Sequence, residues 1–199
     1  MRERGFTLVE LMVAIAILSV LAGVAMPRLG ELLAVRRIQS VAHNLAADYR
    51  TVQTEAIRRN RIVEVAFTNS VPIAANTVSA APVTASAARN WIARVANPTG
   101  PGDFVAGRTL DGDLASVALT HGALRSVGFT PNGRPLDLSA GPAAPVALAA
   151  PLVVRVTAPG TARLRCVSVS TGGSVRVCDP SRPAGTGAAC EPFLPAGAC

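Results

Sequence analysis

Residues 4–10 read Arg-Gly-Phe-Thr-Leu-Val-Glu, and an apolar run continues from there to residue 26. Almost every residue of this run is Leu, Val, Ile, Ala or Met. At about 1.5 Å per residue, it predicts a helix long enough to cross the hydrocarbon core of a membrane. Glu10 interrupts the apolar character. Because an ionisable side chain in such a segment is costly and normally has a function, we expect Glu10 to require a cationic partner.

These residues resemble the class III signal of type IV pilins and type II secretion pseudopilins. The resemblance covers residues 4–27 and implies that a prepilin peptidase cleaves the chain after Gly5 and methylates the new N-terminal residue, Phe6. It makes Glu10 the fifth residue of the mature protein. It also implies that Glu10 pairs with the N-terminal amine of a neighbouring subunit when the chain leaves the membrane for a filament. Glu10 would then set the register of assembly.

Two other interpretations of the N-terminus are open. A basic start followed by an apolar run is also typical of a Sec signal peptide, for which Gly23-Val24-Ala25 offers a small-residue cleavage site. A plain single-pass membrane anchor is the third interpretation. The glutamate argues against a signal peptide, and so does the helical pattern, which continues beyond Pro27.

The composition favours one helix-anchored domain with a modest core. The chain has 199 residues, with one Trp, one Tyr and five Phe, so its core must consist mainly of Val, Leu, Ile and Ala. All 19 basic residues are Arg, and the formal net charge is +7. A basic domain in the periplasm could attract polyanions such as DNA, or Arg could simply be the usual surface charge of this chain.

Four cysteines lie at the C-terminal end: Cys166, Cys178, Cys190 and Cys199. Their even number and an export signal favour disulfides. Zinc is the competing interpretation, but the spacing contains no C-x2-C knuckle. Three pairings are possible and stay open: Cys166 and Cys178 could face each other across a hairpin, while Cys190 could equally join Cys178 or Cys199.

The periodicity predicts one long helix over residues 6–59. Gly23 and Pro27 interrupt it, and Pro27 should kink it. Beyond the kink an apolar stripe recurs at three- and four-residue steps, and Asn60 is a plausible end. The stripe, which we expect to pack on a sheet, consists of Ile38, Val41, Leu45, Tyr49, Val52 and Ala56. The polar residues expected largely off the stripe are Arg36, Arg37, Asp48, Arg50, Arg58 and Arg59.

The remainder of the chain predicts antiparallel strands. They are expected at residues 62–68, 89–95, 124–130 and 152–157, followed by a hairpin of residues 163–170 and 174–178 around Gly172-Gly173. Trp91 should be a core anchor. Residues 71–88 are expected to form an exposed loop or an irregular hairpin with poor packing, and residues 139–151 a loop rich in Ala and Pro. The predicted fold class is therefore α+β and pilin-like, with a long N-terminal helix packed on a C-terminal antiparallel sheet. Four regions follow: a leader (1–5), a membrane and filament-core segment (6–27), an amphipathic segment (28–61) and a periplasmic β-domain (62–199).

Three stretches resemble the GspH/FimT family of minor pseudopilins and minor pilins. Residues 127–135 contain its Phe-x-Pro-x-Gly-Arg turn, residues 163–178 are similar to its closing hairpin, and residues 46–60 are similar to its helix stretch ending in Arg-Arg-Asn. The resemblance implies a structural subunit that helps to initiate or cap a type IV pilus or a type II secretion pseudopilus. Its partners would be the prepilin peptidase, other pilins or pseudopilins and the bacterial inner membrane, with the C-terminal domain in the periplasm.

DNA uptake is the alternative function that this resemblance suggests. Some FimT-type minor pilins bind DNA through a Gly-Arg-x-Arg motif in the closing hairpin. This chain has Gly-Ser-Val-Arg at residues 173–176, so one arginine is missing and only Arg176 is kept. Arg163 and Arg165 on the preceding strand are candidates to compensate, because arginines in a groove bind phosphates with little sequence preference.

No catalytic, metal or cofactor site is predicted. His43 is expected on a partly exposed helix face and His121 in a turn, and neither accompanies a nucleophile motif. Asp111-Gly112-Asp113 hints at a calcium loop, but the later ligands of an EF-hand do not follow. We therefore expect a protein that is not an enzyme.

Overall fold

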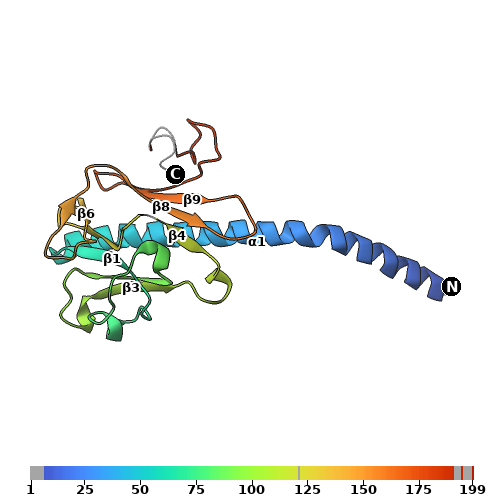
Figure 1. The fold of residues 1–199 in the computed structure, drawn as a ribbon, viewed down its shortest axis with the longest axis horizontal. Helices are drawn as coiled ribbons and strands as arrows, with labels where there is room; N and C mark the ends of the chain where they lie inside the picture. Colours follow the sequence, from blue (N-terminus) through green and yellow to red (C-terminus); the bar gives the residue numbers. More distant parts are fainter. Residues whose placement is uncertain (1–6, 121, 191–193, 195–198) are drawn as a thin grey trace, which may run out of the picture.

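The computed structural model describes residues 7–120, 122–190, 194 and 199, with only the backbone at residues 24–27. Helix α1 (Leu8–Arg59) is followed by a β-domain of short strands. Figure 1 shows that the N-terminal part of α1 projects far from the β-domain, while its C-terminal part runs between two layers of strands. This is the predicted α+β, pilin-like arrangement.

Both ends of α1 carry clear capping signals. Thr7 is the N-cap, and its hydroxyl accepts a hydrogen bond from the backbone N–H of Glu10 in a capping box. Asn60 adopts the left-handed conformation at the C-cap, with φ 51°, and its N–H donates to the carbonyls of Ala56 and Ile57. Asn tolerates this conformation better than most residues, which explains why the helix ends where the sequence predicts.

The helix bends between its two halves. Segments Leu8–Gly23 and Arg28–Arg59 are inclined at 43°, in agreement with the predicted kink near Pro27. Proline has no backbone N–H to donate and therefore breaks the helical ladder. By length and composition, no single helix in the described part of the chain could cross a membrane; the bent pair taken together could.

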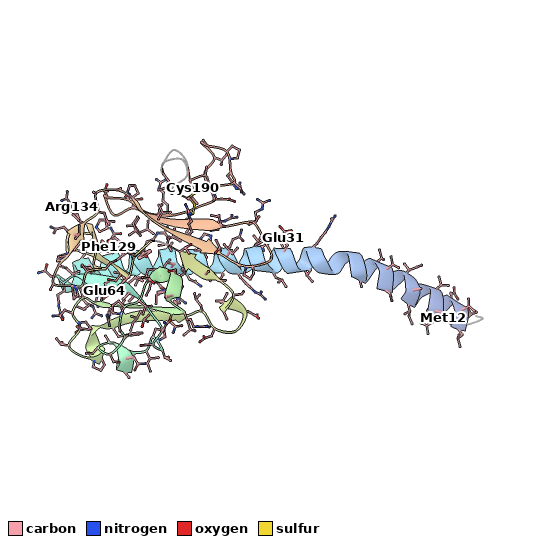
Figure 2. The ribbon with its side chains drawn as sticks, viewed as in Figure 1. Met12, Glu31, Glu64, Phe129, Arg134 and Cys190 are labelled. Atoms are coloured by element: carbon pink, nitrogen blue, oxygen red, sulfur yellow. A yellow bond between two sulfur atoms is a disulfide. The ribbon has the colours of Figure 1, made fainter. Side chains whose placement is uncertain are left out.

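Burial along α1 changes abruptly at Ala34. The described side chains before it are exposed, including Met12 on the projecting segment and Glu31 close to the β-domain (Figure 2). The predicted apolar stripe begins after that point, and each of its members is at most 1% exposed: Ile38, Val41, Leu45, Tyr49, Val52 and Ala56. The two halves of the helix therefore face different surroundings.

Two antiparallel sheets cover α1, where the sequence predicted one. The larger sheet has the order β3-β2-β1-β5-β6-β7 and the smaller one β10-β9-β8-β4. The larger sheet consists of β1 (Val63–Thr68), β2 (Asn90–Val95), β3 (Phe104–Thr109), β5 (Ser126–Phe129), β6 (Pro135–Asp137) and β7 (Val146–Ala147). The smaller sheet consists of β4 (Ala118–Thr120), β8 (Leu152–Thr157), β9 (Arg165–Val169) and β10 (Val175–Cys178).

The predicted strands are all present, and four others are not predictable from their own residues. Strands β3, β4, β6 and β7 are short or only partly buried, so they lack a run of alternating apolar residues. Their neighbours in the sheet specify them instead. The inward faces of both sheets join the helix stripe in one core, in which Trp91 is 1% exposed, as predicted.

Segment 71–88 is partly anchored, which corrects the prediction of an exposed loop. No strand forms within residues 71–88, but Thr77, Ala80 and Ala85 are buried. The reason lies on the outer face of the larger sheet. Arg94 donates to the carbonyls of Thr77 at 2.6 Å and Ala80 at 2.8 Å, and so holds the segment against the sheet.

A buried ion pair supports this anchor. Glu64 and Arg94 face each other on β1 and β2, and the guanidinium Nε donates to the Glu64 carboxylate at 3.0 Å. Their side chains are only 3% and 6% exposed. A desolvated charge pair is tolerated when its hydrogen bonds are satisfied, and here the two backbone carbonyls accept from Nη1 of the same guanidinium.

Asp48 is also buried, contrary to the expectation that it lies off the packed stripe. Its carboxylate accepts a hydrogen bond from the indole N–H of Trp91 at 2.8 Å. It also accepts one from Nε of Arg108 at 3.2 Å, with which it forms an ion pair. Asp48 is 4% exposed. A buried indole N–H needs an acceptor, so the partner that Trp91 requires explains why a carboxylate enters the core.

Candidate functional site

The projecting half of α1 is an apolar surface that the β-domain leaves uncovered. Its large apolar side chains are about half to three-quarters exposed, for example Leu8 at 74% and Leu33 at 47%. Within residues 8–27 Glu10 is the only charged residue. Exposed apolar surface of this extent marks an interaction site with protein or membrane. The described members are Leu8, Val9, Leu11, Met12, Val13, Ile15, Ile17, Leu18, Val20, Leu21, Leu29, Leu32 and Leu33.

Glu10 lies in the first turn of α1 and is exposed. Its Oε2 is 3.5 Å from both the backbone nitrogen and the hydroxyl of Thr7. A carboxylate at a helix N-terminus is favoured by the helix dipole, so the side chain is positioned at the very start of the helix. The predicted cleavage and methylation residues, Gly5 and Phe6, lie outside the described residues.

A junction near the C-terminal end of α1 joins the helix to both sheets. Gln53 donates through Nε2 to the carbonyl of Gly133 at 3.0 Å, in the turn between β5 and β6. Gly173, in the turn between β9 and β10, packs so closely on this point that a Cβ there would lie 2.5 Å from the Gly133 carbonyl oxygen. The two turns that resemble the GspH/FimT family therefore meet in space.

Arg50 attaches the helix to the outer edge of the smaller sheet. Its guanidinium donates to the carbonyl of Val175 at 2.9 Å. Strand β10 is the last strand of that sheet, so this carbonyl would otherwise be an unpaired edge group. Arg50 lies off the stripe as predicted, and its role is to protect this edge.

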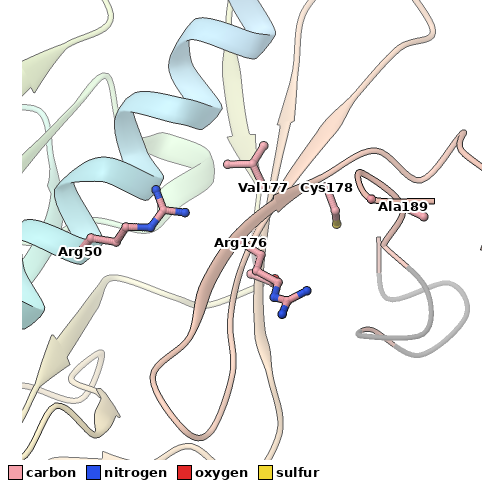
Figure 3. Close-up of a pocket in the computed structure, with 7 residues that line it drawn as sticks. Arg50, Arg176, Val177, Cys178 and Ala189 are labelled. Carbon is pink, nitrogen blue, oxygen red and sulfur yellow. The ribbon is translucent and has the colours of Figure 1, made fainter. Parts of the chain in front are cut away.

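Arg176 lies on the outward face of β10, next to a surface hollow of about 230 Å³. Figure 3 shows Arg50 reaching toward this region from α1 and Arg176 extending from the hairpin. The residues that line the hollow are Arg50, Ser168, Arg176, Val177, Cys178, Gly187 and Ala189. A second hollow of about 230 Å³ on the other side of Arg176 is lined by Ser168, Ser170, Ser174 and Leu194, among others.

The other two arginines proposed for DNA face a turn of the C-terminal tail. Arg165 forms an ion pair with Asp179 at 2.8 Å and is 14% exposed. Arg163 is exposed and donates to the hydroxyl of Ser181 at 3.2 Å. Burial opposes ionisation of Asp179, but hydrogen bonds from Ser181 and the charge of Arg165 outweigh it and hold the pKa of Asp179 below its usual range. Through this ion pair Arg165 holds the C-terminal tail against β9.

Both disulfides connect the closing hairpin to the tail. Cys166 is bonded to Cys199 and Cys178 to Cys190. Cys166 and Cys178 are directly opposed on β9 and β10, as the sequence allowed, yet they are bonded to the tail and not to each other. The four cysteines form a small cluster on the outer face of the sheet with Val153, Leu164 and Leu194.

A second charged cluster stabilises the last turn of α1. Glu55 accepts hydrogen bonds from Arg58 and Arg59, and these contacts lower the pKa of Glu55 to about 2. Arg59 also donates to the carbonyl of Gly102 at 3.0 Å. These residues belong to the helix stretch that resembles the family, and their contacts show a structural role.

Among the described residues, His43 does not join Asp111 and Asp113 in a metal-binding cluster. His43 is exposed on α1, as predicted, whereas His121 lies outside the described residues. Asp111 and Asp113 flank Gly112, whose φ of 58° is typical of a turn. Sequence reasoning missed the structural roles of Gln53, Glu64 and Arg94. A lone Gln on a helix and charges inside a strand carry no signal of their partners.

This architecture, an apolar helix that continues into a packed β-domain, defines a pilin-like subunit. Residues 1–26 match the prokaryotic N-terminal methylation motif. Residues 41–173, more than half of the chain, match the family of type II transport protein GspH, and the chain belongs to this family. The methylation motif implies processing by a peptidase and attachment to a membrane, and the family membership supports the predicted role as a minor pilin or pseudopilin.

The solved structures similar to this chain include two crystal forms of the type IV minor pilin FimU of Pseudomonas aeruginosa. In one form the identity is 14%, the match covers 72% of this chain and 94% of the FimU chain in that structure, and the TM-score is 0.48. In the other the identity is 17%, the coverage is 74% and 92%, and the TM-score is 0.46. No curated protein matches the chain in sequence.

Proposed function

We propose that this GspH-family chain is a structural subunit that joins, and helps to initiate or cap, a type IV pilus or a type II secretion pseudopilus. In this proposal the prepilin peptidase cleaves after Gly5 and methylates Phe6. The apolar half of α1 first holds the protein in the inner membrane, with the β-domain in the periplasm, and then packs among the helices of other pilins or pseudopilins. The role is one of assembly and requires no catalytic group.

The division of α1 at Ala34 is the observation that carries the proposal. The segment before it exposes apolar side chains along its length, and the segment after it is buried against two sheets. A β-domain that is complete without the first segment leaves that segment to bind lipid or other helices. In such surroundings the carboxylate of Glu10 requires a positive partner, and the N-terminal amine of a neighbouring subunit meets this need.

Glu10→Val tests the assembly role. The variant keeps an apolar helix, so we expect normal insertion into the membrane fraction and loss of the protein from sheared filaments and from crosslinked complexes with other pilins. Glu31→Val is the matched control, because it removes an exposed acid from the same helix beyond the predicted membrane and filament-core segment, residues 6–27. Incorporation of the Glu10→Val protein at the parental level would contradict the proposal.

A deletion strain distinguishes the two machines. If the protein helps to prime a type IV pilus, the yield of sheared surface pili should fall in an in-frame deletion and recover on complementation. If pili are unchanged, measurement of secreted protein in the same strains tests the pseudopilus. Loss of neither pili nor secretion would refute the assembly role.

DNA uptake stays a second prediction. Arg176 is exposed at the hollow beside β10, whereas Arg165 is largely buried against Asp179. Arg176→Ala, alone and together with Arg163→Ala and Arg165→Ala, should weaken retention of DNA if the hairpin binds it, and unchanged retention excludes this function.

A further inference from the structure

The four cysteines converge from two directions on the outer face of the smaller sheet. Cys166 and Cys178 occupy opposed positions on β9 and β10, so the backbone ladder fixes their separation. Cys190 and Cys199 come from the tail, which returns over the same face; Figure 2 shows Cys190 beyond the two strands. The strands thus supply a rigid pair of sulfurs and the tail supplies a second pair.

Three of the four sulfur atoms lie close enough to one another to share one ion. The Sγ atoms of Cys166, Cys190 and Cys199 are all within 4.8 Å of one another, and the Sγ of Cys178 is bonded to that of Cys190. In a tetrahedral zinc–thiolate site, with bonds of about 2.3 Å, neighbouring sulfurs are about 3.8 Å apart. Small side-chain movements would therefore convert the present arrangement into such a site once the disulfides are open.

The surroundings also suit a closed structural site. Cys166, Cys178 and Cys190 are at most 6% exposed, and Val153 and Leu194 pack against them and keep water away. Arg176 lies two residues before Cys178 on β10, and positive charge close to a cysteine favours the thiolate over the thiol. The absence of a C-x2-C knuckle carries less weight here, because an antiparallel pair of strands brings two cysteines together in its place.

We propose that Cys166, Cys178, Cys190 and Cys199, when reduced, form a thiolate site for a soft divalent metal ion such as zinc. This goes beyond the proposed function and does not depend on it. The tail would then have two mutually exclusive fastenings, a metal ion in the reduced chain and two disulfides in the oxidised chain. In both states it covers the outer face of β8–β10.

The chemistry balances as follows. Two dithiol molecules open the two disulfides by thiol–disulfide exchange; four electrons pass to the protein sulfurs, which become four thiols, and each dithiol becomes a disulfide. Zn²⁺ then forms four Zn–S bonds and releases one proton for each thiol that was protonated. Two molecules of the dithiol in its disulfide form reverse this process: they take up the four electrons and four protons, the protein sulfurs pair again and the ion leaves.

Cobalt is the probe for this site, because it adopts the same tetrahedral thiolate coordination and is coloured. The full chain in detergent is reduced with a phosphine under anaerobic conditions, freed of the phosphine and titrated with Co²⁺. We expect one equivalent to bind, with a thiolate charge-transfer absorption in the near ultraviolet and intense visible bands of tetrahedral Co²⁺. Zn²⁺ should abolish both, and the oxidised chain should show neither.

Two variants identify the ligands and one serves as control. Cys166→Ser removes a sulfur from the central group and should weaken Co²⁺ binding at least tenfold, whereas Cys178→Ser tests the fourth ligand and should shift the visible bands. His43→Ala, which alters an exposed residue elsewhere on α1, should change nothing. Circular dichroism of the reduced proteins checks that the sheets persist. A reduced, folded chain without the thiolate band, or with a band insensitive to Cys166→Ser, would overturn the proposal.

Discussion

Gln53 and Gly133 are joined by a hydrogen bond of 3.0 Å from the Gln53 amide to the Gly133 carbonyl. This contact links α1 to a turn of the larger sheet, and the turn of the smaller sheet packs on the same carbonyl through Gly173. Because the two sheets belong to different layers, this junction sets their relative position on the helix. Substitution of the glycines at this junction should therefore destabilise the β-domain most.

Gly173→Ala should destabilise the β-domain strongly. Gly173 has φ +88°, which a Cβ disfavours, and the Cβ would lie 2.5 Å from the Gly133 carbonyl oxygen. We expect a loss of about 2–4 kcal/mol in the free energy of unfolding. Gly172→Ala is the matched control, since its Cβ would meet nothing closer than 3.9 Å. Urea unfolding followed by the fluorescence of the single Trp91 measures both; equal midpoints would refute this account of the junction.

Arg94→Met should release segment 71–88 and leave Glu64 buried without its partner. The expected cost is about 3–5 kcal/mol, because a buried charge is left uncompensated on the outer face of the larger sheet. The double variant Glu64→Leu/Arg94→Met removes both charges and should recover much of this loss. Arg89→Met, at an exposed neighbouring position, should change the unfolding free energy by less than about 0.5 kcal/mol. Proteolysis within residues 71–88 should increase in Arg94→Met alone.

Asp48→Ala should leave the buried indole N–H of Trp91 without an acceptor. We expect a loss of about 1–3 kcal/mol, together with a change in Trp91 fluorescence in the folded state. Asp48→Asn keeps an oxygen acceptor and should cost less. Asp113→Ala is the control, since its carboxylate is 92% exposed and its contact with Arg37 is 3.8 Å long. If Asp48→Ala and Asp113→Ala proved equally mild, the core role of Asp48 would be wrong.

The Glu55 cluster predicts a defined dependence of stability on acid. The hydrogen bonds from Arg58 and Arg59 lower the pKa of Glu55 from 4.5 to about 2 in the folded protein. A carboxylate whose pKa is lower in the folded state stabilises the fold at any pH above its unfolded-state pKa. This contribution is lost as the pH falls from that value toward 2. Glu55→Gln should therefore be less stable than the parent near neutral pH and lose less stability between about pH 5 and pH 2.5. Urea midpoints over this range, with Glu31→Gln as control, test the prediction.

Several features could be predicted from the sequence because their signals are local. The apolar run, the single carboxylate of Glu10, the stripe after Pro27 and the end at Asn60 specify α1 through periodicity and capping. The strands with alternating apolar residues are present for the same reason, and Trp91 is in the core. The methylation motif and the GspH match agree with the motifs that the sequence presents.

Other features depend on partners that lie far away in the chain, so only the tertiary structure decides them. The division into two sheets follows from which edges meet around α1, and the burial of Asp48 follows from the position of Trp91. The pairs Cys166–Cys199 and Cys178–Cys190 depend on how the tail returns over β9 and β10. Sequence periodicity determines which face of an element is apolar, whereas the choice of partner is made by packing among several elements at once.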